Sequence, residues 1–384
     1  NLNNVTALAA SSLSDLGTLA TAIGNSEFSN ATGLTTIAVS DTTVDATTLA
    51  ARIDSYDSIN GDGKTDMTLA SGATINVDAG EITAMLADET AGRLTIGDQA
   101  ITVTGAITVD NANLLGLTTT GKVTATIDTS ETVEVLATLN ADGGTNDLTI
   151  AISAADATAA TAEQLNAIDA ATSLAVDARA VTELSGSYSD LVTLYGSSGV
   201  TGLENENITI TGGSLTVTQA NAIDLLTTGV VTASIVTTET VDSLKTLTGT
   251  NNAYTIVISE TSASASDLNT INGLTTATVN LTNVTSITSG TLSDLDTLAT
   301  AINASPAQFI NATNLTTNAV SDSAIDITSS ASTIDSLDQI DSGSSIDMTM
   351  ASGATITVAA SEITEMLTDE SAGRLTISDQ NITV

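Results

Sequence analysis

The sequence predicts a repeat solenoid of the α/β to mainly β class, in which right-handed coils of one or two short strands plus a short helix stack into a parallel β-sheet. Three observations predict this fold. The chain repeats itself at a long and a short period, short apolar strands alternate with short helices, and the apolar residues include almost no aromatic rings.

The long period is the strongest of these observations. Residues 13–23 recur at 292–302 with ten of eleven identical, and residues 89–103 recur at 370–384 with twelve of fifteen identical. Position 13 thus corresponds to position 292 and position 103 to position 384, which gives a period of roughly 280 residues. We therefore expect one continuous solenoid without caps, made of three stretches: a partial repeat at 1–103, the remainder of the period at 104–279, and the start of the next period at 280–384.

Strands are predicted where β-branched and apolar residues alternate with polar ones, as in residues 122–127 (KVTATI) and 254–258 (YTIVI). Such strands recur at intervals of roughly 23 to 39 residues, ten times in one long period. At roughly 4.8 Å per coil, ten coils advance about 48 Å.

Short helices are predicted between the strands. In residues 218–226, Thr218 is positioned to cap a helix on which Ala220, Ile223 and Leu226 share one face. Asp78 with Glu81, and Thr161 with Gln164, have the spacing of a capping box. Gly or Asn turns lead into the next strand.

The composition excludes most enzyme chemistry. The 384 residues contain 72 Thr and 41 Ser but no His, Cys or Trp and only one Pro. Without His or Cys there is no imidazole acid–base pair, no thiolate nucleophile and no zinc site of the usual kind. We expect no enzymatic activity. Few aromatic rings also suit a narrow coil that is filled by Ala, Val, Ile, Leu and Thr.

The charge limits the partners. Forty-five acidic against seven basic residues leave a net charge of -38, which repels nucleic acid and anionic membranes and attracts divalent cations. The longest stretches without charge are rich in Thr, Asn and Ser, so we expect no membrane insertion. At the N-terminus we see no secretion signal.

Residues 215–235 and 244–258 resemble the Ala/Thr-rich repeats of giant cell-surface and extracellular-matrix proteins of cyanobacteria, with the similarity clearest over residues 101–281. The resemblance implies a very long, secreted protein at the cell surface or in the matrix, in some cases linked to motility or adhesion. The Gly-Gly-x-Gly-x-Asp nonapeptide of calcium-binding repeat adhesins is absent.

One loop is a candidate calcium site. Asp57, Asn60, Asp62 and Asp66 offer oxygen ligands around an Asn-Gly-Asp-Gly core that resembles an EF-hand loop. The register is imperfect, because Leu69 stands where that loop has its closing glutamate. A plain Asn-Gly turn is the alternative, and calcium is the only cofactor that the sequence indicates.

From these observations we expect a structural repeat rod of a secreted surface or filament-forming protein. It would extend by continuation of the same long chain or by head-to-tail self-association, because an uncapped coil exposes strand edges. Its localisation would be extracellular, at the cell surface or in a surface layer. The alternative is a calcium-stiffened adhesin module that binds glycan or another surface.

Overall fold

The computed structural model describes residues 1–384 except 61–64, 141–144, 250 and 327–346. The described residues form two compact units, one of residues 1–182 and 193–203, the other of residues 183–192 and 204–384. Each unit is α/β: short strands form several parallel sheets, and short helices connect them. The α/β class and the parallel pairing predicted from the sequence are confirmed.

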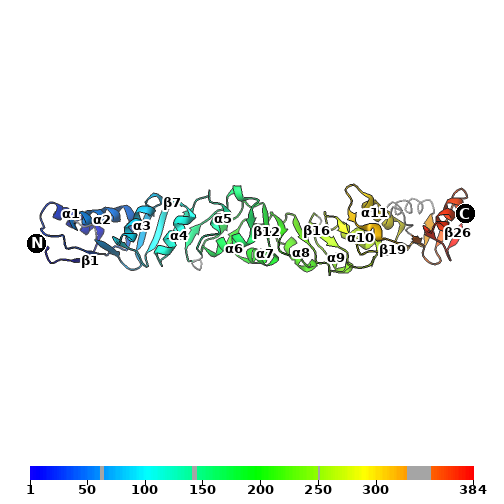
Figure 1. Ribbon diagram of the computed structural model, residues 1–384, viewed down its shortest axis with the longest axis horizontal. Helices are drawn as coiled ribbons and strands as arrows, with labels where there is room; N and C mark the ends of the chain where they lie inside the picture. Colours follow the sequence, from blue (N-terminus) through cyan, green and yellow to red (C-terminus); the bar gives the residue numbers. More distant parts are fainter. Residues whose placement is uncertain (61–64, 141–144, 250, 327–346) are drawn as a thin grey trace. The chain divides into compact units, whose positions relative to one another are not determined.

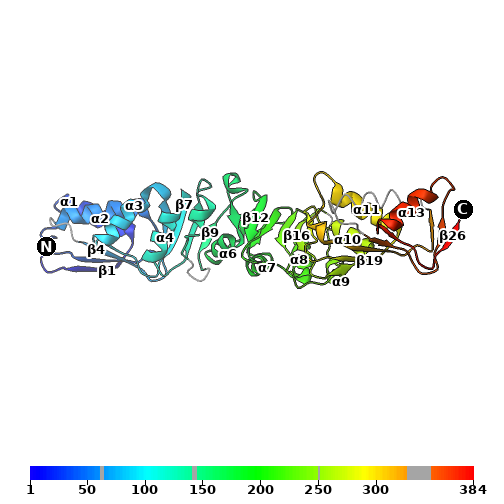
Figure 2. The same ribbon diagram turned by 45° about the vertical axis from the view of Figure 1, so that its right-hand side comes forward.

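The first unit contains two larger sheets, with strand orders β1-β2-β4-β6 and β3-β5-β7-β8-β9. In chain order its main elements are β1 (Ala7–Ser11), α1 (Leu13–Gly24), β2 (Thr36–Val39), β3 (Thr43–Asp45), α2 (Ala46–Asn60), β4 (Asp66–Leu69), β5 (Thr74–Asp78), η1 (Ala79–Glu81), α3 (Ile82–Thr90), β6 (Leu94–Thr95), β7 (Ala100–Ile107), α4 (Val109–Thr118), β8 (Val123–Ile127), α5 (Val133–Leu136), β9 (Asp147–Thr149), η2 (Ala154–Asp156), β10 (Ala160–Thr161), α6 (Ala162–Ala170), β11 (Val176–Asp177) and β13 (Val200–Thr201). Helices α1, α2 and α3 follow one another side by side (Figures 1 and 2).

In the second unit, β12, β14, β15, β16, β18 and β20 follow one another in one sheet, β17-β19-β21-β23-β25 form another, and β22-β24-β26 a third. Its elements are β12 (Glu183–Gly186), β14 (Asn207–Ile210), α8 (Val217–Asp224), β15 (Val231–Ser234), α9 (Val241–Leu244), β16 (Ala253–Val257), β17 (Ser262–Ala263), α10 (Ala265–Asn272), β18 (Val279–Asn280), β19 (Ser286–Gly290), α11 (Leu292–Asn303), β20 (Phe309–Ile310), η3 (Ala312–Asn314), β21 (Thr317–Val320), β22 (Ala324–Asp326), β23 (Asp347–Thr349), β24 (Thr355–Thr357), α13 (Ile363–Ser371), β25 (Leu375–Thr376) and β26 (Asn381–Thr383). Helix α7 (Tyr188–Gly196) begins directly after β12.

The core of each unit is a stack of aliphatic side chains in register. Ile75 pairs with Ile101, and Ile101 with Val123, and all three are buried. Alternate residues of the same strands point outward and are mostly threonine or asparagine, which explains the period-2 pattern of the sequence. Because neighbouring strands are paired residue by residue, apolar side chains from successive segments lie directly on one another.

The helix predictions are confirmed in type, with two changes at the caps. Thr161 and Gln164 form the expected capping box. Helix α8 begins at Val217 and its cap is Thr216, not Thr218, because Gln219 completes a capping box with Thr216. Asp78 makes no capping hydrogen bond, since a 3₁₀ turn precedes α3 there.

The two copies of the long repeat fold alike where both are described. Helices α1 and α11 both have twelve residues, and α3 and α13 both have nine. Individual contacts recur at the offset of the sequence repeat: Ser71 with Asp98 matches Ser352 with Asp379, and Thr95 with Asp66 matches Thr376 with Asp347. Side-chain contacts between strands thus repeat with the sequence, which indicates that the repeat is a structural period.

Candidate functional site

Four buried threonine hydroxyls each connect a segment to the segment before it, where a segment means the residues from one strand to the next strand that pairs with it. Each hydroxyl donates to a backbone carbonyl of the preceding segment and accepts from the N–H two residues further on. The donor–acceptor distances to the carbonyls are 2.5 Å for Thr119 with Gln99, 2.8 Å for Thr172 with Leu148, 2.6 Å for Thr227 with Glu206 and 2.8 Å for Thr275 with Tyr254. The accepted N–H groups belong to Gly121, Leu174, Gly229 and Ala277. These threonines are all buried.

At Thr172 the hydroxyl replaces a neighbouring strand. The Leu148 N–H donates to Thr172 Oγ1 at 2.9 Å, and the Leu148 carbonyl accepts from this hydroxyl at 2.8 Å. One side chain therefore satisfies both backbone groups of a buried strand residue, and Leu174 N–H donates to it as well, at 3.1 Å. A buried backbone group without a partner is costly, so this hydroxyl is needed at a place where the next strand is out of reach.

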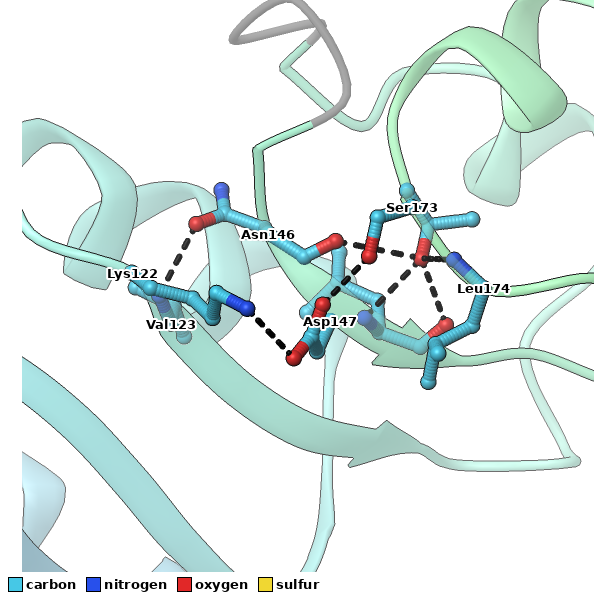
Figure 3. A network of polar contacts seen from close by, with 8 residues as sticks. Lys122, Val123, Asn146, Asp147, Ser173 and Leu174 are labelled. Carbon is cyan, nitrogen blue, oxygen red and sulfur yellow. Dashed lines mark hydrogen bonds and ion pairs between the residues drawn. The ribbon is translucent and has the colours of Figure 1, made fainter.

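The same network continues outward to charged groups. Asn146 Oδ1 accepts from Val123 N at 2.9 Å, and Lys122 Nζ pairs with Asp147 Oδ2 at 2.9 Å (Figure 3). The Ser173 hydroxyl also donates to Asp147. This hydrogen bond first, and then Lys122, hold the pKa of the Asp147 carboxyl below its usual range, because both favour the ionised form.

Asparagine side chains bridge successive segments at two further places, imitating the backbone of a strand. In each case the amide donates to a carbonyl of the following segment and accepts from an N–H two residues beyond that carbonyl. Asn113 Nδ2 donates to Thr138 O at 3.0 Å and Asn113 Oδ1 accepts from Asn140 N at 2.8 Å, while Asn221 makes the same pair with Thr246 O at 2.8 Å and Thr248 N at 2.9 Å.

Acidic side chains of one segment cap the helix of the segment before it. In each case a carboxylate oxygen accepts from the backbone N–H of the first helical residue. The distances are 2.6 Å for Asp41 on Leu13, 3.1 Å for Glu131 on Val109, 3.1 Å for Asp156 on Val133, 2.9 Å for Glu239 on Val217, 2.7 Å for Glu260 on Val241 and 2.7 Å for Asp322 on Leu292. A negative charge at a helix N-terminus satisfies an N–H without an intrahelical partner and interacts favourably with the helix dipole.

We call these threonine, asparagine and carboxylate contacts the inter-segment seam. They join residues 19 to 30 positions apart. The threonine and acidic side chains bond to the preceding segment, whereas Asn113 and Asn221 bond to the following one. These contacts are hydrogen bonds that connect one short segment to the next.

The basic side chains in the described ranges are all engaged. Arg52 donates to Leu13 O, Lys245 pairs with Asp242 and Asp267, and Arg179 pairs with Asp177. Lys122 pairs with Asp147, Arg93 with Asp57 and Asp88, and Arg374 with Asp369. The seventh base, Lys64, lies outside the described residues. The described positive charges therefore have partners within the protein, and the electrostatic potential around it is dominated by acidic groups.

The residues of the candidate calcium loop have other partners in the structure. Asp57 accepts from Thr65 N at 3.2 Å and pairs with Arg93 Nη1 at 3.3 Å. Asn60 is buried and its Nδ2 donates to Leu34 O at 2.9 Å, while Asp66 accepts from the Thr95 hydroxyl at 2.9 Å. Asp62 lies outside the described residues. In the described ranges no three acidic residues are grouped so that they could hold a metal ion.

Sequence reasoning missed the four buried threonines and the capping acids. A signal for three of these threonines exists: Thr119, Thr227 and Thr275 each stand in a Thr-Thr-Gly or Thr-Thr-Ala stretch ahead of a strand. The capping acids have no such local signal, because the helix that each one caps lies in the preceding segment.

A comparison with known proteins finds neither a family model nor a curated protein that matches the chain. Among the described residues, no helix combines the length and the apolar character needed to span a membrane.

Proposed function

We propose that this chain is a structural repeat protein, built as a right-handed α/β solenoid whose role is to extend as a rod. The inter-segment seam is the observation that carries the proposal. Its contacts recur in both units, and they use the side chains of one segment to complete the backbone of another. Segments that are incomplete alone and complete when stacked are the physical basis of solenoid arrays.

The rod would consist of one ten-coil period and part of the next, with residues 1–103 corresponding to 280–384 and residues 104–279 filling the rest. The matching elements of the two copies support this division. Parallel strands add one after another in such an array, so the strand that follows β26 could be supplied by a continuation of the chain or by a second copy. Head-to-tail extension is proposed on this basis.

The charge supports an extracellular role in which rods stay apart from one another. All six described bases are paired with acids or carbonyls, so excess negative charge faces outward and opposes binding of nucleic acid. Divalent cations would screen this charge between neighbouring rods. The resemblance to surface-protein repeats supports secretion to the cell surface or into filaments.

The experiment that tests the rod uses the internal period. Residue 384 corresponds to residue 103, so a second copy of residues 104–384 can be joined after residue 384 in phase. This adds one full period and, for a solenoid, lengthens the particle by about 48 Å at roughly 4.8 Å per coil. A globule of the same size would instead see its radius of gyration rise only from about 21 to about 26 Å.

Small-angle X-ray scattering and negative-stain electron microscopy measure the maximum dimension of both chains. A gain of about 48 Å at constant cross-section supports the rod. An unchanged aspect ratio would refute it. Sedimentation velocity at rising protein concentration, with and without a chelator, tests head-to-tail association and its dependence on divalent cations.

A further inference from the structure

The second unit contains a small cleft, lined by both polar and apolar groups, that the inter-segment seam does not use. It has a volume of about 250 Å³ and is lined by Ser187 and Tyr188 at the start of α7 and by Thr211, Gly212, Gly213 and Gln219 around the turn between β14 and α8. We call it the Tyr188 cleft. It lies where two paired strands end together, since Gly186 of β12 is in register with Ile210 of β14.

Extra residues after β14 open this cleft. Only Ser187 separates β12 from α7, whereas the whole stretch 211–216 separates β14 from α8, so the turn after β14 is much longer. Gly212 adopts a φ of +79°, which favours glycine, and neither Gly212 nor Gly213 has an atom within 4 Å of the position of a Cβ. The two glycines of the turn after β14 therefore have no close neighbours, and the space next to Tyr188 is open.

The cleft contains one of the few aromatic rings of this protein. The chain has four tyrosines and two phenylalanines. Tyr56, Tyr254 and Phe309 are fully buried, and the Tyr195 hydroxyl is enclosed, whereas Tyr188 is half-buried and lines the cleft. A partly exposed ring offers an apolar face next to a polar tip.

Polar groups line the same cleft as this ring. The Gln219 side-chain oxygen accepts from Thr216 N at 3.0 Å, which orients the amide; among the described residues nothing accepts from its NH₂ group. Thr211 is exposed at the rim and adds a hydroxyl that can donate and accept. The Ser187 hydroxyl donates to Asp190 at 2.6 Å, so a carboxylate stands beside the cleft, and none of the described basic side chains lines it.

From this combination we infer that the Tyr188 cleft binds a neutral saccharide. A sugar ring has an apolar C–H face that fits against an aromatic ring, and hydroxyls that pair with amide and hydroxyl groups. The cleft is smaller than a pocket for a drug-sized ligand, so it would take one sugar ring of a longer glycan. Asp190 and the net charge of -38 disfavour anionic sugars. This inference is independent of the rod proposal.

The test uses the full chain and defined probes. Saturation-transfer NMR and calorimetric titration measure binding of cellotetraose, maltotetraose and chitotetraose, with dextran sulfate as the anionic comparison. We expect at least one neutral tetrasaccharide to bind and dextran sulfate not to bind. Tyr188→Ala should weaken binding about tenfold or more, because it removes the ring, whereas Tyr188→Phe should keep most of it.

Phe28→Ala, which removes an exposed ring in the other unit, is the matched control and should bind like the wild type. Circular dichroism confirms that each variant folds. The inference is overturned if none of the neutral probes binds, if dextran sulfate binds in their place, or if Tyr188→Ala binds as tightly as Phe28→Ala. Particle length measured on the same variants is unaffected in each of these outcomes, so the rod proposal is tested separately.

Discussion

Replacing Thr172 by valine tests the inter-segment seam at a hydroxyl that satisfies both backbone groups of a buried strand residue. Valine keeps the shape of threonine but removes the hydroxyl that accepts from Leu148 N and Leu174 N and donates to Leu148 O. The Leu148 N–H is buried and would lose its partner, and the Leu174 N–H is partly buried. Each unsatisfied buried group costs about 1–3 kcal/mol, so we expect Thr172→Val to lower the free energy of unfolding by about 2–4 kcal/mol.

Two further variants separate the hydroxyl from the packing. Thr172→Ser keeps the hydroxyl and loses one buried methyl group, which should cost about 1 kcal/mol. Thr149→Val makes the same chemical change on the exposed side of β9 and should alter stability by less than about 0.5 kcal/mol.

Urea unfolding followed by far-ultraviolet circular dichroism gives the free energies. Hydrogen exchange of the Leu148 amide reports directly on its hydrogen bond to Thr172, and we expect faster exchange in Thr172→Val than in Thr172→Ser. If Thr172→Val proves as stable as Thr149→Val, the hydroxyl is not what holds these segments together and the reasoning fails.

Three further outcomes are expected. Glu131→Gln removes the charge that caps α4 and should cost about 0.3–1 kcal/mol at low salt, whereas Glu89→Gln, in the last turn of α3, should not destabilise; thermal unfolding at two salt concentrations compares them. Glu206 is fully buried, and its Oε1 has no hydrogen-bond partner among the described residues, so Glu206→Gln, which buries an uncharged amide instead, should raise the unfolding free energy by about 1 kcal/mol, and a loss of stability in urea would contradict this. The pKa of Asp147 is lowered in the folded state. The ionised carboxylate therefore stabilises the fold at pH values above its unfolded pKa of about 3.9, and this stabilisation is lost as the pH falls through the pKa of the folded state. Between pH 6 and 3 the melting temperature should therefore fall less steeply for Ser173→Ala than for the wild type, because this variant lacks the main cause of the lowered pKa. An equally steep fall in both proteins would contradict this.

The positions of strands and helices could be predicted because their signals are local. The alternation in residues 122–127 marks β8, and the Thr161–Gln164 spacing marks the start of α6. The cap of α8 was misplaced by two residues because Thr216 and Thr218 both suit a cap by type, and only the Gln219 side chain, which closes a capping box on Thr216, distinguishes them.

Two residues of the candidate calcium loop have contacts that local spacing could not predict. Asp57 and Asn60 have the residue types of a calcium site, yet Asp57 pairs with Arg93, 36 residues away, and Asn60 bonds to Leu34 O, 26 residues away. Neither partner is close in the sequence, so local spacing alone has no access to them.

By itself the sequence determined the class of fold, the long internal period and the absence of imidazole and thiol chemistry, because composition and periodicity are properties of the chain. Tertiary structure alone decided which polar groups meet. Thr172 with Leu148 and Glu131 with Val109 are 24 and 22 residues apart and come together only when strands pair in parallel and in register. The physical reason is that a buried N–H or carbonyl must be satisfied, and in short segments the partner comes from the next one.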